Sequence, residues 1–280
     1  MGPPNNPAPA VGLSVVVPTY NERDHIEDLI DRICDAWDNS PEAAATGAIE
    51  IVVVDDNSPD GTGQYADAIA RRRPVRVVHR AGKQGLGTAV MAGFEVAQGR
   101  LIAVMDADLS HPPHLLPRLV RTLRDTHADF VVASRYVSGG SNDDWLLRRV
   151  MSRTACTAAR VLTPVRDAMS GFFVLEAERA KSARTVASGF KILLELIVRT
   201  SPKTVVELPY EFVGRTAGKS KMNLAEALGF LKQLWDLSRF NAGRGAGRPR
   251  HLVADASSPD AADAGSRYKV GVVDVNSPRS

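Results

Sequence analysis

A short apolar run that ends in two aspartates constrains this chain more than any other feature. Leu101-Ile-Ala-Val-Met105 is followed at once by Asp106 and Asp108. The run is too short for a core helix, so it predicts a buried strand. Ligands of open α/β sheets bind at the carboxyl ends of strands, where these carboxylates would lie. Two such charges repel each other unless a cation is present, and a hard divalent cation that bridges to a diphosphate would fit. A solvated turn is the alternative for an isolated Asp-x-Asp.

Two further apolar runs end in polar clusters. Residues 13–17 lead into Pro18-Thr-Tyr-Asn-Glu22, where the proline should end a strand and a helix should open at Asn21 or Glu22. Residues 49–54 lead into Asp55-Asp56-Asn-Ser-Pro-Asp-Gly-Thr62. Because helical patterns follow each run, we expect an α/β fold in one domain. The three strand ends should share one edge of a mostly parallel central sheet.

Composition is that of a globular protein. The chain has 280 residues, of which 44% are hydrophobic and 24% charged, enough for one sizeable domain. The net charge of +3 gives no reason to expect a nucleic-acid partner. Cys34 and Cys156 show no metal-ligand spacing and are expected to be reduced core thiols. No apolar stretch approaches the length of a membrane span, and the amino end does not resemble a signal peptide.

The chain divides by composition into four parts. We expect a flexible leader over 1–11, one globular domain over 12–215, a basic loop with an amphipathic helix over 216–240, and a mostly disordered tail over 241–280. Tyr268-Lys-Val-Gly-Val-Val in the tail is read as disordered, with a short strand or docking peptide as the alternative. The helix, over 224–240, either lies on a membrane with Trp235 at headgroup level or packs on the globular domain.

A glycine-rich run precedes a predicted helix over 88–97. Backbone amides of Gly82-Lys-Gln-Gly-Leu-Gly87 could hold an anion at the start of that helix, with Lys83 near a phosphate. A structural turn explains the run equally well, and its spacing is not that of a dinucleotide-binding motif.

Taken together, the motifs carry a resemblance to a known family. Residues 18–22, 55–62 and Asp106-Ala-Asp108-Leu-Ser-His-Pro-Pro113 resemble inverting family 2 glycosyltransferases with the GT-A (Rossmann-like) fold. More narrowly, they resemble dolichol- or polyprenol-phosphate mannose synthases, including the actinobacterial type. The resemblance covers about 12–240, through Ser134-Arg-Tyr136, Ser170-Gly-Phe172 and Gly214-Arg215 to Lys221.

The resemblance implies transfer of mannose, with inversion, from GDP-mannose to a polyprenyl phosphate, dependent on Mg²⁺ or Mn²⁺. It implies an enzyme on the cytoplasmic side of the membrane, bound peripherally or through an integral membrane partner. One alternative is a family 2 transferase with another donor, such as UDP-glucose. Another is a non-catalytic subunit that binds a sugar nucleotide, although the intact Asp106, Asp108, Arg135 and Arg215 speak against it.

The resemblance also implies residue roles. The donor would contact Pro18, Tyr20, Glu22, Val54, Asp56, Asp106, Ala107, Asp108, Arg215 and Lys221. The metal would lie on Asp108, with Asp106 and Ser110 beside it. Archaeal relatives have a glutamine in place of Ser110, so a water molecule could complete the shell there. Asp108, Arg135 and Arg215 would be catalytic.

The acceptor phosphate would be held by Arg135, Arg149 and Ser152, with Arg148 as a rival to Arg149. The planar guanidinium can give a phosphate two parallel hydrogen bonds. Asp167-Ala-Met-Ser-Gly171 lacks the Glu-Asp pair from which many family 2 enzymes draw a general base. A phosphate monoester is already ionised and needs no base. Asp167 could then orient an arginine or the sugar, or be a turn residue.

Overall fold

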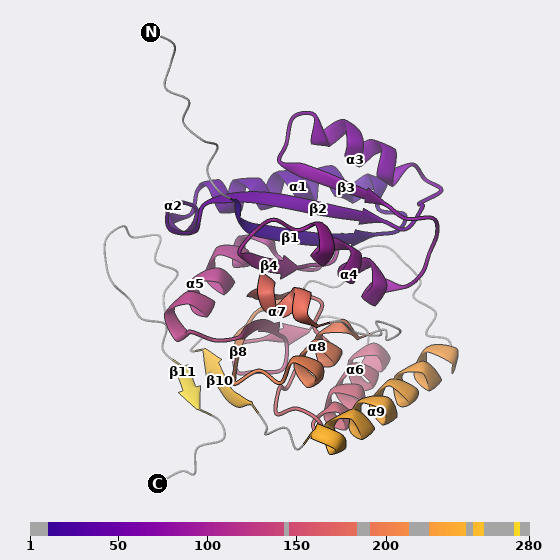
Figure 1. Cartoon of the computed structure of the whole chain (residues 1–280), viewed down its shortest axis with the longest axis vertical. Coiled ribbons are helices and arrows are strands. Elements are labelled where there is room, and N and C mark those ends of the chain that lie inside the picture. The colour runs from indigo at the N-terminus through magenta and orange to yellow at the C-terminus, as the bar shows by residue number, and fades with distance from the viewer. Residues whose placement is uncertain are drawn as a thin grey trace.

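The computed structural model describes residues 11–142, 146–183, 191–212, 224–244, 249–254 and 272–274, with the side chains of 142, 146–151, 224–228, 244 and 272–274 left aside. A nine-stranded sheet runs through the described part of the chain in the order β11-β10-β8-β5-β7-β4-β1-β2-β3 (Figure 1). β7 is antiparallel to both neighbours and β11 is antiparallel to β10, whereas the other pairings are parallel. The predicted α/β fold with a mostly parallel sheet is confirmed.

The strands have the following bounds: β1 Val11–Thr19, β2 Ala48–Asp55, β3 Val75–His79, β4 Leu101–Val104, β5 Phe130–Ser134, β6 Ser141–Asn142, β7 Phe173–Glu176, β8 Thr204–Pro209, β9 Glu211–Phe212, β10 Arg250–Ala254 and β11 Val272–Asp274. The helices are α1 Arg23–Asp38, α2 Pro41–Thr46, α3 Thr62–Ala70, α4 Leu86–Val96, α5 Leu116–Thr126, α6 Leu146–Ala159, α7 Ala177–Ser182, α8 Ile192–Thr200 and α9 Leu224–Arg244, with a 3-10 turn η1 Pro113–Leu115.

Helices cover both faces of the sheet because its central strands are apolar on both sides. In β1, Val15 and Val17 pack in one core cluster with α1, α3 and α5, while Val16 packs in a second with α4, α8 and α9. Strands that are buried on both faces carry near-continuous apolar runs, which is why the sequence pattern located them.

Pro18 does not end its strand, contrary to the sequence-based expectation. β1 continues to Thr19, and Pro18 pairs with Val54 of β2. Val16 O accepts a hydrogen bond from Met105 N, so Val16 and Pro18 direct their backbone groups to the β4 side. β4 ends at Val104, so the missing N–H of Pro18 leaves no ladder bond unmade.

Part of the segment expected to be mostly disordered belongs to the sheet. β10 pairs in parallel with β8, and β11 pairs with β10, while 245–248, 255–271 and 275–280 lie outside the described residues. The division into a leader, a catalytic domain and a tail therefore stays a prediction, but the tail also contributes to the sheet. The strand at Arg250–Ala254 is an integral part of the sheet.

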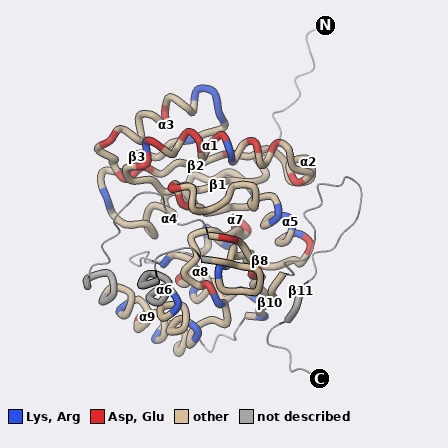
Figure 2. The backbone as a smooth tube through the Cα atoms, turned by 180° about the vertical axis from the view of Figure 1, so that it is seen from behind, with Lys and Arg blue, Asp and Glu red and all other residues tan. Residues whose placement is uncertain are grey.

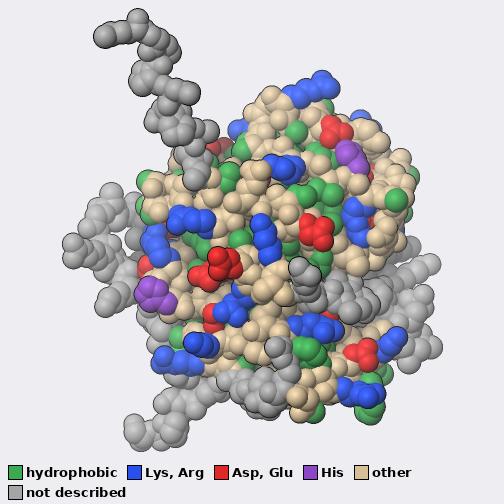
Figure 3. Space-filling view, in the orientation of Figure 1, with side chains coloured by type: hydrophobic (Ala, Val, Ile, Leu, Met, Phe, Trp, Pro, Cys, Tyr) green, Lys and Arg blue, Asp and Glu red, His purple; other side chains and the backbone are tan. Residues whose placement is uncertain are grey.

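The helix predicted over 224–240 is present as α9. Its Leu237 is buried in the core cluster that contains α8, whereas Leu231 and Trp235 are 60% and 64% exposed. α9 therefore packs on the domain by one side and offers two large apolar side chains on the other. Lys and Arg residues occur along α9 (Figure 2). In the space-filling view, hydrophobic (green) and basic (blue) side chains lie next to one another over the part of the molecule where α9 lies (Figure 3). Among the described helices, none is long and apolar enough to cross a membrane.

Candidate active site at the carboxyl edge of the sheet

The ends of β1, β2 and β4 meet at one edge, as predicted, and the loop after β4 carries the paired aspartates. Ser110 donates two hydrogen bonds to Asp108 Oδ1, from its backbone N at 3.1 Å and from its Oγ at 2.5 Å. Ser110 is thus buried beside Asp108 and orients its carboxylate. The side chain of Asp106 is 30% exposed, and its Oδ2 lies 3.8 Å from Nε2 of His111.

His111 holds the loop that carries the paired aspartates. Its Nδ1 accepts the backbone N–H of Asp106 at 3.0 Å, which places the ring proton on Nε2, toward the carboxylate. The ring stacks on Phe172 at 5.3 Å between centroids. Burial lowers the pKa of His111 even though Asp106 and Asp108 act in the opposite direction, so the ring is neutral near pH 7. His111 stands within the motif Asp106–Pro113, but no local pattern marks it as the support of this loop.

The donor set suits a hard divalent cation that also takes substrate oxygens. Within the described residues no group of three or more His, Cys, Asp or Glu side chains forms a closed metal cage. Mg²⁺ and similar ions are held by one or two carboxylates, with phosphates and waters completing the shell. Gly171 keeps the approach open, because a Cβ there would lie 3.0 Å and 3.1 Å from the two oxygens of Asp106. The residues present therefore fit such an ion.

Two of the predicted donor residues lie in the loop between β1 and α1. Tyr20 is 38% exposed, and Nζ of Lys83 lies 4.2 Å from the centre of its ring. This contact brings the glycine-rich loop over the loop after β1. Glu22 precedes the first turn of α1, where its backbone N–H is bonded to Thr62 Oγ1 at 3.0 Å.

Asp56, predicted to contact the donor, is engaged with the same glycine-rich loop. Its Oδ1 accepts from Arg80 Nη1 at 2.5 Å and its Oδ2 from the backbone N of Gln84 at 3.2 Å. The side chains of both Asp56 and Arg80 are less than a tenth exposed. Asp56 therefore ties the end of β2 to the loop before α4. Arg80 was missed because nothing local marks it as the partner of Asp56. Pro18, Val54 and Ala107 are buried at the same edge of the sheet.

Arg135, predicted to bind the acceptor phosphate, is held by Asp167. The Nε and Nη2 of Arg135 donate to the two oxygens of Asp167 at 2.8 Å each, and its backbone N donates to Oδ2 at 3.0 Å. The carboxylate is fully buried, while the arginine side chain is 12% exposed. Burial acts to lower the pKa of Arg135, but the hydrogen bonds and charge of Asp167 outweigh it and raise the pKa. Of the alternatives for Asp167, the contacts favour orientation of an arginine.

An aromatic cluster joins the aspartates to Arg135. His111 contacts Tyr210 and Phe212 edge to face at 6.1 Å and 6.3 Å, and the Arg135 guanidinium lies 5.4 Å from the ring of Phe212. The hydroxyl of Tyr210 is buried and forms no hydrogen bond within the described residues. Burial raises the pKa of Tyr210, so the hydroxyl stays protonated and can donate. A buried donor of this kind between a carboxylate pair and an arginine suits an anionic ligand.

Lys191 places a titratable amine near these groups. Burial and then the charge of Arg135 lower its pKa, while Asp106 and Asp167 act in the opposite direction. Its ammonium therefore lies within electrostatic range of both halves of the site. No local motif marks this lysine, which stands just before α8.

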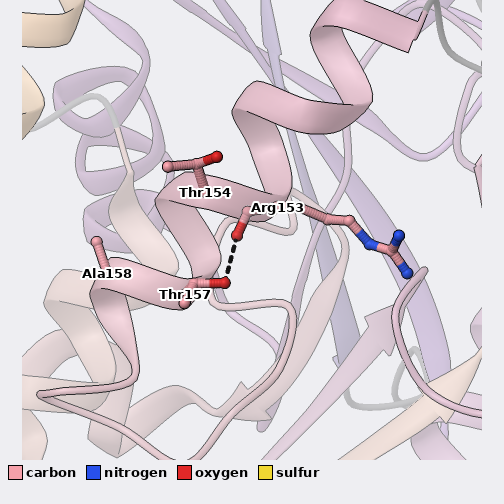
Figure 4. Close-up of a pocket in the computed structure, with 4 residues that line it drawn as sticks. All are labelled: Arg153, Thr154, Thr157 and Ala158. Atoms are coloured by element: carbon pink, nitrogen blue, oxygen red, sulfur yellow. Dashed lines mark hydrogen bonds between the residues drawn. The ribbon is translucent and has the colours of Figure 1, made fainter.

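Some predicted residues fall beyond what can be described. Arg215 and Lys221 lie outside the described residues, as do the side chains of Arg148 and Arg149 on α6. Ser152 is on the described part of α6 and is half-buried. The next residue, Arg153, lines a surface depression with Thr154, Thr157 and Ala158, but its guanidinium points away from them (Figure 4). It lies 5.7 Å from the ring of Tyr136.

Comparison with known proteins decides the family. Residues 14–194 match the model of glycosyl transferase family 2. The chain belongs to this family. A dolichol-phosphate mannosyltransferase of Saccharomyces cerevisiae is 40% identical over 84% of the chain and 90% of the yeast protein. A polyprenol monophosphomannose synthase of Mycolicibacterium smegmatis is 37% identical over 84% and 91%. The predicted resemblance to family 2 enzymes and to these mannose synthases is confirmed.

Other relatives differ in length or share only the fold. A dolichol-phosphate mannosyltransferase of Pyrococcus furiosus is 37% identical over 81% of this chain, but the match spans 64% of that protein. The solved glucosyl-3-phosphoglycerate synthase of Mycobacterium tuberculosis, in complex with Mn²⁺ and UDP, matches with a TM-score of 0.59 at 23% identity, over 83% of this chain and 80% of that one. The mannosyltransferase of Pyrobaculum calidifontis, in complex with GDP-Man and Mn²⁺, matches with a TM-score of 0.55 at 19% identity, over 86% and 66%.

Proposed function

We propose that this family 2 glycosyltransferase moves mannose from GDP-mannose to a polyprenyl phosphate and inverts the sugar. The observation that carries the proposal is the pairing, at one sheet edge, of two aspartates with an arginine preset by Asp167. The first can hold a metal–diphosphate and the second an anionic acceptor. The names of the yeast and mycobacterial relatives support the choice of sugar and lipid.

On the donor side, Asp108 and Asp106 would hold Mg²⁺ or Mn²⁺, with Ser110 orienting Asp108. When bound, the ion stabilises the negative charge that develops on the leaving diphosphate. Tyr20 offers an exposed ring to the base or ribose, and Lys83 above it supplies a cation near the phosphates. Pro18, Glu22, Val54, Asp56 and Ala107 would shape the nucleotide pocket. Arg215 and Lys221 would close over the diphosphate.

On the acceptor side, Arg135 would bind the lipid phosphate with the N–H groups that Asp167 leaves available, Nη1 among them. Ser152 and Arg149 of α6 would complete the phosphate site. The phosphate oxygen is ionised near neutral pH and can attack the sugar directly, so the site needs alignment and charge stabilisation more than a base. Asp167 would therefore serve to orient Arg135 and not as a base, because both of its oxygens already accept hydrogen bonds from Arg135.

We also propose that the protein binds peripherally to the cytoplasmic side of the membrane, directly or through an integral membrane partner. The exposed Leu231 and Trp235 on α9 support direct binding. Replacing both by glutamate should reduce binding to anionic liposomes, because charged groups disfavour the apolar boundary. Transfer to a short-chain, water-soluble polyprenyl phosphate should persist. Full liposome binding by the folded variant would place membrane contact elsewhere.

A donor and acceptor comparison tests the function. Purified protein is given radiolabelled GDP-mannose or UDP-glucose with polyprenyl phosphate, with and without Mn²⁺ or Mg²⁺, and unphosphorylated polyprenol is the matched control acceptor. We expect label in the lipid phase only with GDP-mannose, polyprenyl phosphate and metal. Efficient use of UDP-glucose alone would establish the alternative donor, and binding of either nucleotide without any transfer would favour a non-catalytic subunit.

A further inference from the structure

A buried chain of hydrogen bonds connects Arg135 to the edge strand β10. Asp167, which clamps Arg135, is itself placed by Glu207: the backbone N–H groups of Arg166 and Asp167 donate to the two Glu207 oxygens at 2.8 Å and 2.9 Å. The Nε2 of His251 lies 2.5 Å from Glu207 Oε2. Glu207 is the acceptor for both backbone N–H groups, and we assign it the same role here, with the imidazole nitrogen as the donor.

Each link in this chain is removed from solvent. The side chains of Asp167 and Glu207 are 0% exposed and that of His251 is 2% exposed. Buried carboxylates persist only where donors satisfy them, and a half-satisfied buried network is costly. Glu207 therefore needs all three of its donors, two from the 166–167 turn and one from β10.

The register of β10 brings His251 to Glu207. His251 pairs with Val205 in the parallel ladder between β10 and β8. Side chains two residues apart along a strand share a face, so Glu207 and Val205 project to the same side as His251. β10 also holds to β8 at its start, where Arg250 N donates to Lys203 O at 2.7 Å. A strand from the carboxyl-terminal part of the chain thus delivers one side chain to the back of the candidate acceptor site.

We propose that His251 is a positioning residue for the acceptor phosphate, acting through Glu207 and Asp167 on Arg135. Loss of its N–H would leave Glu207 Oε2 with only the Arg166 N–H among its present donors, so the carboxylate would be held less firmly and would place the 166–167 turn less precisely. Asp167 would then no longer fix the guanidinium in the orientation that binds a phosphate monoester. The inference rests on the proposed function for the identity of the ligand, but the link from His251 to Arg135 can be measured without it.

The first test follows the arginine directly. In the ¹⁵N-labelled full chain, the Arg135 Nε–H signal, assigned by its loss in Arg135→Lys, should exchange slowly with water because the bond to Asp167 protects it. His251→Leu should speed this exchange by about tenfold or more, as expected when a hydrogen bond to a charged group is lost from the network. His251→Gln, which keeps a side-chain N–H donor of similar reach, should restore slow exchange. Unchanged exchange in His251→Leu would refute the inference whatever the enzyme transfers.

The second test uses kinetics. His251→Leu should raise KM for polyprenyl phosphate about tenfold with little change in KM for GDP-mannose, and His251→Gln should recover most of the difference. Leu252→Ala is the matched control, since it weakens the packing of the same strand in the core cluster without touching Glu207. It should lower the melting temperature and leave both KM values near those of the wild type.

A double-mutant cycle separates positioning from general destabilisation. In an Arg135→Lys background the two-pronged bond to Asp167 is already lost, so adding His251→Leu should have much less effect on KM for the lipid. If the two substitutions instead raise KM for the lipid by independent factors that multiply in the double variant, His251 acts on stability alone and the inference is overturned. A wild-type protein that transfers no mannose would instead contradict the proposed function, and the exchange measurement would still decide the role of His251.

Discussion

Asp167→Asn should uncouple Arg135 from the protein while changing the size of the side chain very little. The carboxylate accepts two side-chain bonds from Arg135 at 2.8 Å and one backbone bond at 3.0 Å, and it is fully buried. An asparagine presents one oxygen and one NH₂ group in the same space. The NH₂ group would face a guanidinium N–H, so one of the paired bonds is lost and the compensating charge disappears.

The size of the effect follows from these bonds. A hydrogen bond to a charged group contributes about 1.5–3 kcal/mol, and the surviving oxygen of asparagine retains part of this. We expect a loss of about 2–3 kcal/mol, which is a decrease of about 30- to 150-fold in kcat/KM for polyprenyl phosphate. KM for GDP-mannose should change by less than about threefold, because the residues proposed for the donor lie in the loops after β1, β2 and β4.

The assay is steady-state mannosyl transfer with each substrate varied in turn, together with a thermal melt. Asp67→Asn is the matched control, because Asp67 pairs with His79 at 3.0 Å while its side chain is 51% exposed. Exposed pairs contribute about 0–1 kcal/mol, so this variant should behave like the wild type. Wild-type kinetics in Asp167→Asn would refute the view that Asp167 presets Arg135. An equal rise in both KM values would place Arg135 in the donor site.

Four further outcomes follow from the site. Asp108→Asn should abolish transfer and metal-dependent binding of GDP-mannose in calorimetry, because the carboxylate charge is what binds the ion; near-normal turnover would remove Asp108 from the metal site. Arg135→Lys should lower transfer at least tenfold with donor affinity retained, since lysine lacks the planar fork; a matching fall in donor affinity contradicts this. Tyr210→Phe should cost about tenfold in kcat/KM at unchanged thermal stability, if its buried hydroxyl donates to a bound anion; unchanged kinetics would exclude that contact. Burial raises the pKa of Cys34 to about 11 and of Cys156 to about 12, so at pH 8 neither should be alkylated by iodoacetamide in the native protein, and both should be in urea; rapid native alkylation would show that the thiols are accessible.

The sheet was largely predictable where strands are locally encoded. Leu101–Met105 and the apolar run before Pro18 are buried on both faces, so their composition alone marks them. β10 was missed because His251-Leu-Val-Ala254 is short and begins with a polar residue. It is a strand because it pairs with β8, an interaction between segments far apart in the chain. The same holds for Pro18: a proline is accepted within β1 because the neighbouring β4 ends before it, which the local sequence does not reveal.

The candidate site was predictable where a local sequence motif marks the functional residues. Asp106, Asp108 and Arg135 were named from the sequence, and they stand around one aromatic cluster. His111 and Lys191 were missed because their proximity to these groups arises from packing between distant segments. Burial lowers the pKa of both groups, and this too is a property of the fold that leaves no local pattern.

The stereochemistry of the product tests the central claim most directly. That claim is a single displacement in which the lipid phosphate, held by Arg135, attacks the sugar of GDP-mannose, an α-linked donor, without a protein nucleophile. The lipid product made from ¹³C-labelled GDP-mannose is extracted, and the one-bond carbon–hydrogen coupling at C1 is measured by NMR. The account predicts a β-mannosyl phosphate at every time point. An α-mannosyl phosphate, or label trapped covalently on the protein, would contradict it.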